Sequence, residues 1–210
     1  MSTYKAFEVR EETEKKFVGA IVEKSALELV EGSVSIEVHY SSVNYKDALS
    51  ASGSKAVTRE YPHVPGIDAA GTVLASTDSN FAVGDEVVVT GYDLGMNTAG
   101  GFGQQVTVPG GWVTKLPVGL SLRDSMVLGT AGLTAGLCVN KLLLNGITPE
   151  AGKVLVTGAT GGVGIIACAL LVKLGFEVVA STGKLAETAK LTALGVSEVI
   201  SREAFSEENP

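Results

Sequence analysis

The sequence predicts an antiparallel β-barrel or sandwich followed by a doubly wound α/β unit. The chain has 210 residues, of which 45% are hydrophobic and 19% charged, so it can bury a sizeable core. Its first half combines short apolar segments with frequent glycine and proline breaks, which is typical of antiparallel strands. From about residue 121 the pattern changes to alternating strands and helices, which is typical of a parallel sheet.

The first half contains two clear strands. In residues 34–40, Val34, Ile36, Val38 and Tyr40 alternate with polar residues, so this strand should have one solvated face. Residues 85–90 contain three consecutive valines and predict a short buried strand. The breaks between such segments fall at Pro62, Pro65, Gly66, Gly71, Gly84, Gly91, Gly100, Gly101, Gly103, Pro109, Gly110, Gly111 and Pro117.

The second half begins with a helix signal. Ser121 and Asp124 have the spacing of a capping box, and Asp is a weaker partner there than Glu. A helix rich in small apolar residues should follow at about 130–144. Beyond it we expect strands at 154–156, 177–180 and 196–200 and helices at 161–174 and 185–194.

The turn after the first of these strands carries a cofactor motif. Residues 157–164 read Thr-Gly-Ala-Thr-Gly-Gly-Val-Gly. On the G-x-G-x-x-G pattern Ala159 replaces the first glycine, whereas Gly161 and Gly164 keep the other two. Gly161 would let a pyrophosphate approach the backbone, and Gly164 would let the helix pack closely on the strand. The helix N-terminus favours phosphate. This context predicts a dinucleotide site rather than a plain tight turn.

The end of the next strand indicates which dinucleotide binds. NAD-binding units carry an Asp or Glu about 20 residues after the first glycine. Here residues 180–184 read Ala-Ser-Thr-Gly-Lys. The hydroxyls of Ser181 and Thr182 and the cation of Lys184 suit a 2′-phosphate. We therefore predict NADP(H), with NADPH bound more tightly than NADH; the alternative is an ordinary solvated lysine.

The overall composition excludes several classes of protein. The net charge is −7 without a basic cluster, which argues against nucleic acid or an anionic membrane as partner. No apolar run approaches the ~20 residues of a membrane span, and residues 1–10 lack a signal-peptide pattern. Cys138 and Cys168 lie in apolar helical segments and are predicted to be buried thiols. These features predict a cytoplasmic protein.

Four further segments carry a family resemblance: residues 42–49, 65–73, 84–91 and 129–135. With the glycine turn, and in this order, they resemble the medium-chain dehydrogenases/reductases. The resemblance is greatest to the zinc-independent quinone-oxidoreductase-like branch and, within it, to the acrylyl-CoA reductase group. It implies a GroES-like antiparallel β-barrel domain over residues 1–120. Linker helices and the first part of a Rossmann NADP-binding domain would occupy residues 121–210.

The resemblance also implies that zinc is absent. Zinc alcohol dehydrogenases of this superfamily bind metal through a Cys, a Gly-His-Glu segment and a later Cys. Here Asn44 stands near the first position, and Gly66, Ile67 and Asp68 replace the second segment. The two histidines, His39 and His63, are scattered and predicted to be surface or turn residues. We expect no His/Cys tetrahedral site.

Without a metal the resemblance implies reduction of a conjugated double bond. NADPH would deliver hydride to an enoyl thioester such as acryloyl-CoA, to an enone or to a quinone. Asn44 and Tyr45 would lie beside the nicotinamide. Tyr45 would donate a hydrogen bond to cofactor or substrate, or serve only as an anchoring aromatic. Asp68 would orient groups near the cleft, or simply begin a strand.

Further cofactor contacts follow from the same resemblance. Arg202 would provide a second cation near Lys184, which suits a 2′-phosphate, or would be an ordinary exposed arginine. The predicted cofactor-binding residues are Tyr45, Thr160, Gly161, Gly162, Val163, Gly164, Ser181, Thr182, Gly183, Lys184 and Arg202.

Members of this family are usually much longer, and residues 206–210 fall about halfway through the expected doubly wound sheet. A half sheet leaves an unpaired edge. The chain would be a cloned or proteolysed fragment, which we favour, a truncated gene product, or part of a larger assembly. The full-length protein is expected to be a homodimeric reductase. The alternative is a non-catalytic NADPH-binding or structural fragment without the second half of the Rossmann domain.

Overall fold

The computed structural model describes residues 3–205 and divides into two compact units. Unit 1 is Met1–Thr130 and unit 2 is Ala131–Pro210. The sequence predicted a division between residues 120 and 121, ten residues before the observed one. The observed division lies within a helix that begins in unit 1 and continues into unit 2. Each unit has a hydrophobic core of its own.

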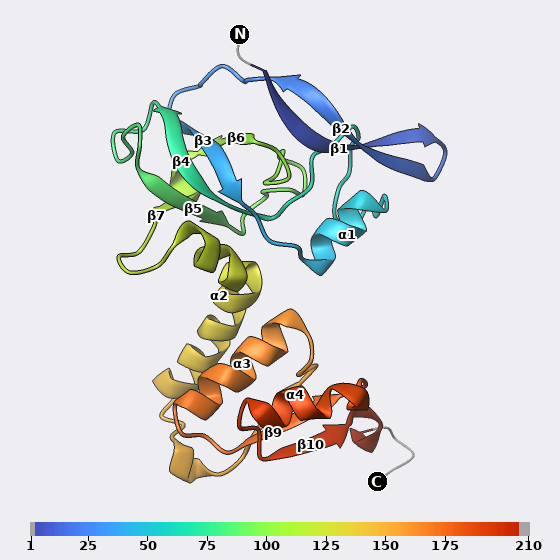
Figure 1. Ribbon diagram of the computed structural model, residues 1–210, viewed down its shortest axis with the longest axis vertical. Helices are drawn as coiled ribbons and strands as arrows, with labels where there is room; N and C mark the ends of the chain where they lie inside the picture. Colours follow the sequence, from blue (N-terminus) through green and yellow to red (C-terminus); the bar gives the residue numbers. More distant parts are fainter. Residues whose placement is uncertain (1–2, 206–210) are drawn as a thin grey trace. The chain divides into compact units, whose positions relative to one another are not determined.

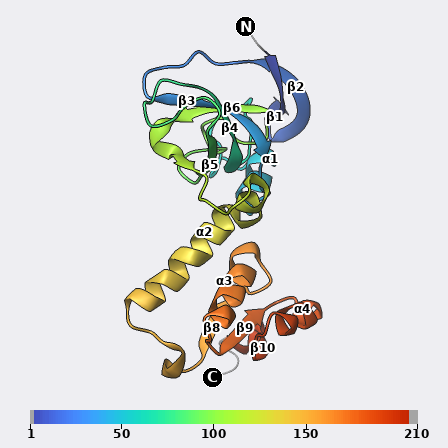
Figure 2. The same ribbon diagram turned by 60° about the vertical axis from the view of Figure 1, so that its left-hand side comes forward.

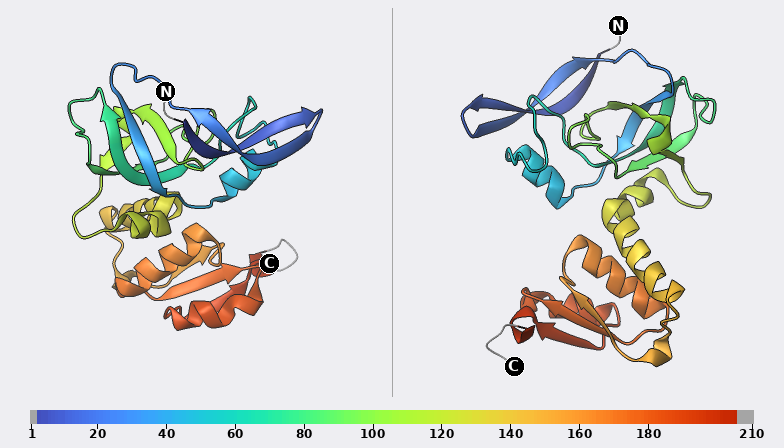
Figure 3. Two further views of the ribbon diagram at one scale, coloured as in Figure 1. Left: turned by 45° about the horizontal axis from the view of Figure 1, so that its top comes forward. Right: turned by 180° about the vertical axis from the view of Figure 1, so that it is seen from behind.

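Unit 1 is built from antiparallel strands. A hairpin of β1 (Thr3–Thr13) and β2 (Lys16–Ser25) extends beside a curled five-stranded sheet (Figures 1 and 3). The strand order of that sheet is β6-β3-β4-β5-β7. Its members are β3 (Ser33–Tyr40), β4 (Asp68–Ser76), β5 (Glu86–Thr90), β6 (Gln105–Pro109) and β7 (Val113–Lys115). The predicted antiparallel β domain is confirmed.

Branched side chains fill the inside of the curled sheet, as period-two alternation requires. In β3, Val34 and Ile36 are buried and Glu37 is exposed. Two positions differ from the prediction. Ser35 is buried, because its Oγ accepts a hydrogen bond from Gln105 Nε2 at 2.6 Å. Tyr40 is exposed at the end of the strand, where the core no longer reaches.

Helix α2 (Leu122–Leu144) begins in unit 1 with the predicted box. Ser121 Oγ donates to Asp124 Oδ2 at 2.7 Å, and Asp124 N donates to Ser121 Oγ at 3.0 Å. The helix is interrupted at Gly129, where φ is 50° and ψ is −156°. By length and hydropathy α2 reaches the range of a membrane span. The interruption leaves no continuous helical stretch of the ~20 residues that a span needs.

Unit 2 is a parallel sheet with the order β10-β9-β8. Helix α3 packs against β8 and β9 (Figure 2). The predicted helix over 185–194 is shorter, because a 3-10 turn precedes α4. The elements are η2 (Pro149–Ala151), β8 (Val154–Thr157), α3 (Gly162–Lys173), β9 (Val178–Thr182), η3 (Leu185–Glu187), α4 (Thr188–Ala193), β10 (Glu198–Ser201) and η4 (Arg202–Phe205). This arrangement confirms the doubly wound unit; the sequence end at 206–210 lies outside the described residues.

Two predictions about burial are wrong. Cys168 is buried as expected, but Cys138 is exposed. Val139 of α2 faces the core, and the preceding residue lies about 100° away around the helix. His63 is not at the surface: it is only 7% exposed. Its backbone pairs with Val9 in both directions, at 2.8 and 2.9 Å, which draws the imidazole inward.

Candidate functional site

The carboxylate of Asp68 organises the predicted site in unit 1. Asp68 begins β4 and is fully buried. It accepts hydrogen bonds from Asn44 Nδ2 at 2.9 Å, from Thr130 N at 3.0 Å and from Thr130 Oγ1 at 2.7 Å. The hydroxyl of Ser42 also donates to it. These four hydrogen bonds compensate the free-energy cost of burying the Asp68 carboxylate.

Gly129 allows Thr130 to reach Asp68. A Cβ atom at position 129 would lie 2.7 Å from Asp68 Oδ2 and 3.1 Å from Ser42 Oγ. The positive φ at this residue also favours glycine. The interruption of α2 therefore turns a backbone N–H toward the buried carboxylate.

A second carboxylate, Asp47, holds Asn44 in place. Asn44 is the N-cap of α1 (Tyr45–Ala51), and its backbone N donates to Asp47 Oδ2 at 2.7 Å. The other oxygen of Asp47 accepts from Gly66 N at 3.1 Å and Ile67 N at 2.9 Å. Burial raises the pKa of the Asp47 carboxyl, while these N–H groups act in the opposite direction. Asp47 thus joins the start of α1 to the segment that leads into Asp68.

The structure brings the three predicted catalytic residues into one region. Asn44 and Asp68 are directly hydrogen-bonded, and Tyr45 follows Asn44 as the first residue of α1. Tyr45 is 80% exposed, so its ring is accessible to a ligand. The sequence analysis missed Ser42, Asp47 and Thr130. For Asp47 there was a signal, because an acid three residues after an Asn is a capping box.

The glycine turn of unit 2 has the backbone that its sequence predicts. Gly158 has a φ of 60°, and Gly161 is the extended N-cap of α3. A Cβ atom on Gly164 would overlap the carbonyl oxygen of Gly158. Glycine at 164 therefore lets α3 lie close against the turn. The first N–H groups of a helix have no partner within the helix, which suits them to bind an anion.

A cavity of about 740 Å³ opens beside this turn. It joins the ends of β8 and β9, as expected for a ligand site at the carboxyl ends of parallel strands. Its lining residues are Thr157, Gly158, Thr160, Gly161, Ser181, Thr182, Gly183, Lys184 and Arg202. Three predicted contacts lie elsewhere in unit 2: Gly162, Val163 and Gly164 border a neighbouring cavity beside Cys138 and Val139.

Arg202 crosses over Gly183 at the rim of this cavity. A Cβ atom at position 183 would lie 2.9 Å from Arg202 Nε, so a larger residue would displace the guanidinium. The arginine is exposed and lies 3.5 Å from Glu203 Oε1. The two cations predicted near a phosphate, Lys184 and Arg202, therefore line one cavity.

The two hydroxyl residues of this strand end are almost completely buried. Thr182 Oγ1 accepts a hydrogen bond from Lys184 N at 3.0 Å and lies 2.8 Å from Thr160 Oγ1. Thr182 thus ties the end of β9 to the glycine turn. The exposed groups that remain for a phosphate are the cations.

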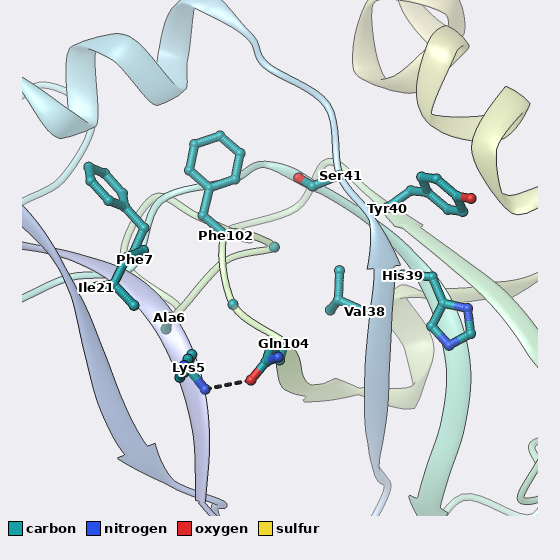
Figure 4. A pocket seen from close by; sticks show the side chains of 12 residues that line it. Lys5, Ala6, Phe7, Ile21, Val38, His39, Tyr40, Ser41, Phe102 and Gln104 are labelled. Carbon is teal, nitrogen blue, oxygen red and sulfur yellow. Dashed lines mark hydrogen bonds between the residues drawn. The ribbon is translucent and has the colours of Figure 1, made fainter.

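Unit 1 has a further apolar cavity, of about 460 Å³, between the β1–β2 hairpin and the end of β3 (Figure 4). Phe7, Ile21 and Phe102 form one side, and Tyr40 and Ser41 lie at the other. A hydrogen bond from Lys5 N to Gln104 Oε1, 2.8 Å long, joins its walls. This cavity contains none of the predicted site residues.

Within residues 3–205, no group of three or more His, Cys, Asp or Glu side chains could hold a metal ion. His39 lies on the surface near Glu37, and His63 is buried in unit 1. The positions of these histidines do not test zinc independence, which stays a prediction.

Comparisons with known proteins agree with both units. Residues 30–118 match the alcohol dehydrogenase GroES-like domain. The chain is 53% identical over 179 residues to the putative quinone oxidoreductase YhfP of Bacillus subtilis, covering 85% of this chain and 54% of that protein. It is 44% identical over 200 residues to the probable acrylyl-CoA reductase AcuI of Escherichia coli, covering 95% of this chain and 62% of that protein.

The chain is a quinone-oxidoreductase-like medium-chain dehydrogenase/reductase. Two solved structures share its fold. The yhdH oxidoreductase of Salmonella enterica, in complex with NADP, has a TM-score of 0.92 and 44% identity over 97% of this chain. Bacillus subtilis yhfP with NAD bound has a TM-score of 0.92 and 46% identity over 99%. The chain spans 62% and 63% of these two structures, respectively.

Proposed function

We propose that the protein is a zinc-independent, NADPH-dependent reductase of the double bond of a conjugated enoyl thioester, such as acryloyl-CoA, or of a quinone. The observation that carries the proposal is the cavity of unit 2, where Lys184 and Arg202 line the end of β9 and none of the lining residues is acidic. The names of the relatives, acrylyl-CoA reductase and quinone oxidoreductase, support the two substrate classes. The relative with bound NAD makes cofactor preference the first point to test.

The residues of unit 2 fit such a cofactor. The start of α3 would bind the pyrophosphate, and Arg202 and Lys184 would bind the 2′-phosphate. When bound, NADPH supplies the hydride.

The residues of unit 1 would act on the substrate carbonyl. Negative charge develops on this oxygen during reduction, and a preorganised donor stabilises it. The Tyr45 hydroxyl is the exposed donor of the site. Asp68 fixes the amide of Asn44, because Asn44 Nδ2 donates to it at 2.9 Å. The proposal also includes a small-molecule substrate, a cytoplasmic location and a homodimer for the full-length protein. It includes no nucleic acid or membrane partner.

Cofactor titration tests the proposal. NADPH should bind the chain much more tightly than NADH. Arg202→Ala should weaken NADPH roughly ten- to 100-fold, the usual value of a charge-assisted hydrogen bond, and leave NADH unchanged. Arg202→Lys should lose less affinity for NADPH than Arg202→Ala, because lysine keeps the positive charge. Lys173→Ala, at the other end of α3, is the matched control and should change neither constant. Equal dissociation constants for NADPH and NADH in the wild type would refute the preference.

Turnover of the full-length gene product tests the reaction. We expect NADPH consumption with acryloyl-CoA, a short enone or a benzoquinone. Tyr45→Phe should lower kcat roughly 100-fold or more if its hydroxyl stabilises the developing charge. Full kcat in this variant would remove the hydroxyl from the chemistry. Cofactor binding without any turnover would favour a non-catalytic protein.

A further inference from the structure

Tyr92 has an unusual backbone at the end of β5. Its φ is 55°, directly after Gly91 with a φ of 88°. Among the described residues, the other non-glycine residue with positive φ is Lys15, in the β1–β2 turn. A bulky side chain in this region is an outlier that the surrounding structure must support. Leu94, two residues later, is fully buried, so the sharp turn brings the chain back into the core.

The ring of Tyr92 is stacked on Trp112. The centroids are 5.3 Å apart and the rings are nearly parallel, at 6°. Trp112 packs against the core of the curled sheet, so it is a firm support. Tyr92 nevertheless remains 63% exposed. Because Trp112 covers one face of the ring, the other face is open to solvent.

This aromatic pair lies at the same end of the sheet as Asp68. In the ladder between β4 and β5, Asp68 pairs with Thr90, two residues before Tyr92. In the next ladder, Val89 of β5 pairs with Val113, the residue after Trp112. Adjacent strands are about 4.8 Å apart, so the backbone at Trp112, two strands away, lies roughly 10 Å from the Asp68 backbone.

We infer that Tyr92, supported by Trp112, is the stacking surface for the ring of a quinone substrate. This inference rests on the proposed function and names the substrate class that unit 1 favours. A flat conjugated ring gains offset-stacking energy on an open aromatic face. A strained, exposed aromatic residue near the candidate catalytic groups is understandable as a binding element, since strain of this kind is retained at functional sites.

Trp112 fluorescence provides the test, because it is the only tryptophan of the chain. A soluble, fully substituted benzoquinone avoids addition to the exposed thiol of Cys138. When this quinone is titrated into the protein without cofactor, it should quench the fluorescence of Trp112, and the quenching should saturate. In Tyr92→Gly, which relieves the backbone strain and should therefore fold, the affinity should fall roughly three- to tenfold, the loss of one stacking contact. Tyr92→Phe should retain the affinity for the quinone, because phenylalanine keeps the aromatic ring.

Tyr40→Ala is the matched control, since Tyr40 is an exposed aromatic residue of the other apolar cavity. It should leave the quenching curve unchanged. Equal curves for wild type and Tyr92→Gly, or non-saturable quenching, would overturn the inference. So would saturable quenching by coenzyme A but not by the quinone.

Turnover separates this inference from the proposed function. In the full-length protein, Tyr92→Gly should raise KM for the quinone and leave kcat and the kinetics of a short enone unchanged. If the protein is not a reductase, no substrate is consumed but the quenching remains. If only the inference fails, turnover proceeds and the variant behaves as the wild type.

Discussion

At the scale of single residues, polar groups in this protein are buried where they hold backbone segments together. Asp47 and Asp68 both lie in the interior and accept hydrogen bonds from residues distant in sequence. His63 is a different case: its Nε2 is buried and has no hydrogen-bond partner among the described residues. Burial lowers the pKa of this imidazole below its ordinary value.

His63 should therefore make stability depend on pH. Its folded pKa is below the unfolded value of about 6.5, so the unfolded chain binds the proton more readily. The free energy of unfolding should be highest above pH 6.5 and fall as the pH decreases toward the lowered pKa, by at most about 1.4 kcal/mol per pH unit. Denaturant unfolding at several pH values measures this slope.

His63→Gln supplies the comparison, because glutamine keeps a polar side chain and does not titrate. The difference in unfolding free energy between wild type and variant should change between pH 6.5 and pH 5. A constant difference across this range would show that His63 does not titrate on unfolding.

Several residues predicted to bind the cofactor lie close together in unit 2. The glycine turn pointed to Gly161 and Gly164, the acid-free strand end to Lys184, and the family resemblance to Arg202. These residues line one cavity or its immediate neighbour. The burial of His63 could not be foreseen, because it depends on pairing with Val9, 54 positions away in sequence. Whether the predicted residues act as assigned stays a prediction.

At the scale of elements, helix α3 depends on close contact between its first turn and the glycine turn before it. Gly164→Ala places a methyl group against the carbonyl of Gly158. We expect a loss of about 1–3 kcal/mol in the unfolding free energy of unit 2, and weaker NADPH binding, since the helix must shift. Thermal unfolding and cofactor titration measure the two effects.

Gly136→Ala in α2 is the opposite case and the control. Nothing lies within 4 Å of a Cβ atom at this position. Alanine is a better helix former than glycine, so this variant should gain about 0.5–1 kcal/mol and bind NADPH normally. A Gly164→Ala protein as stable as Gly136→Ala would show that the close approach of α3 is unimportant.

Element boundaries were harder to predict than element types. The period-two pattern located β3, and the apolar run located α3 to within a residue at each end. The helix expected at about 130–144 begins at the residue after Gly129, but the interruption of a longer helix at this glycine was not predicted. The cause is tertiary: Thr130 N donates to Asp68, 62 positions earlier. Local sequence carries no information about such a partner.

At the scale of the whole molecule, two units with separate cores should respond differently to a ligand. The predicted phosphate-binding residues lie in unit 2, and the only tryptophan lies in unit 1. NADP⁺ at 100 times its dissociation constant should stabilise the unit that binds it by about 2.7 kcal/mol. Helix circular dichroism should then shift to higher temperature more than Trp112 fluorescence does.

The control for this experiment is Arg202→Ala, in which both transitions should move less. Identical shifts of the dichroism and fluorescence transitions in the wild type would contradict independent units. Such coincidence would show that the chain unfolds as one cooperative body.

The hydrogen bonds of Asp68 also bear on how this sequence can change in evolution. One carboxylate satisfies Ser42, Asn44 and Thr130, and Gly129 provides the space for it. Loss of the acid alone would strand several donors in the interior, and any side chain at 129 would collide with it. We therefore expect these five positions to be constrained together in evolution, because a substitution at one of them is disfavoured unless the others change as well.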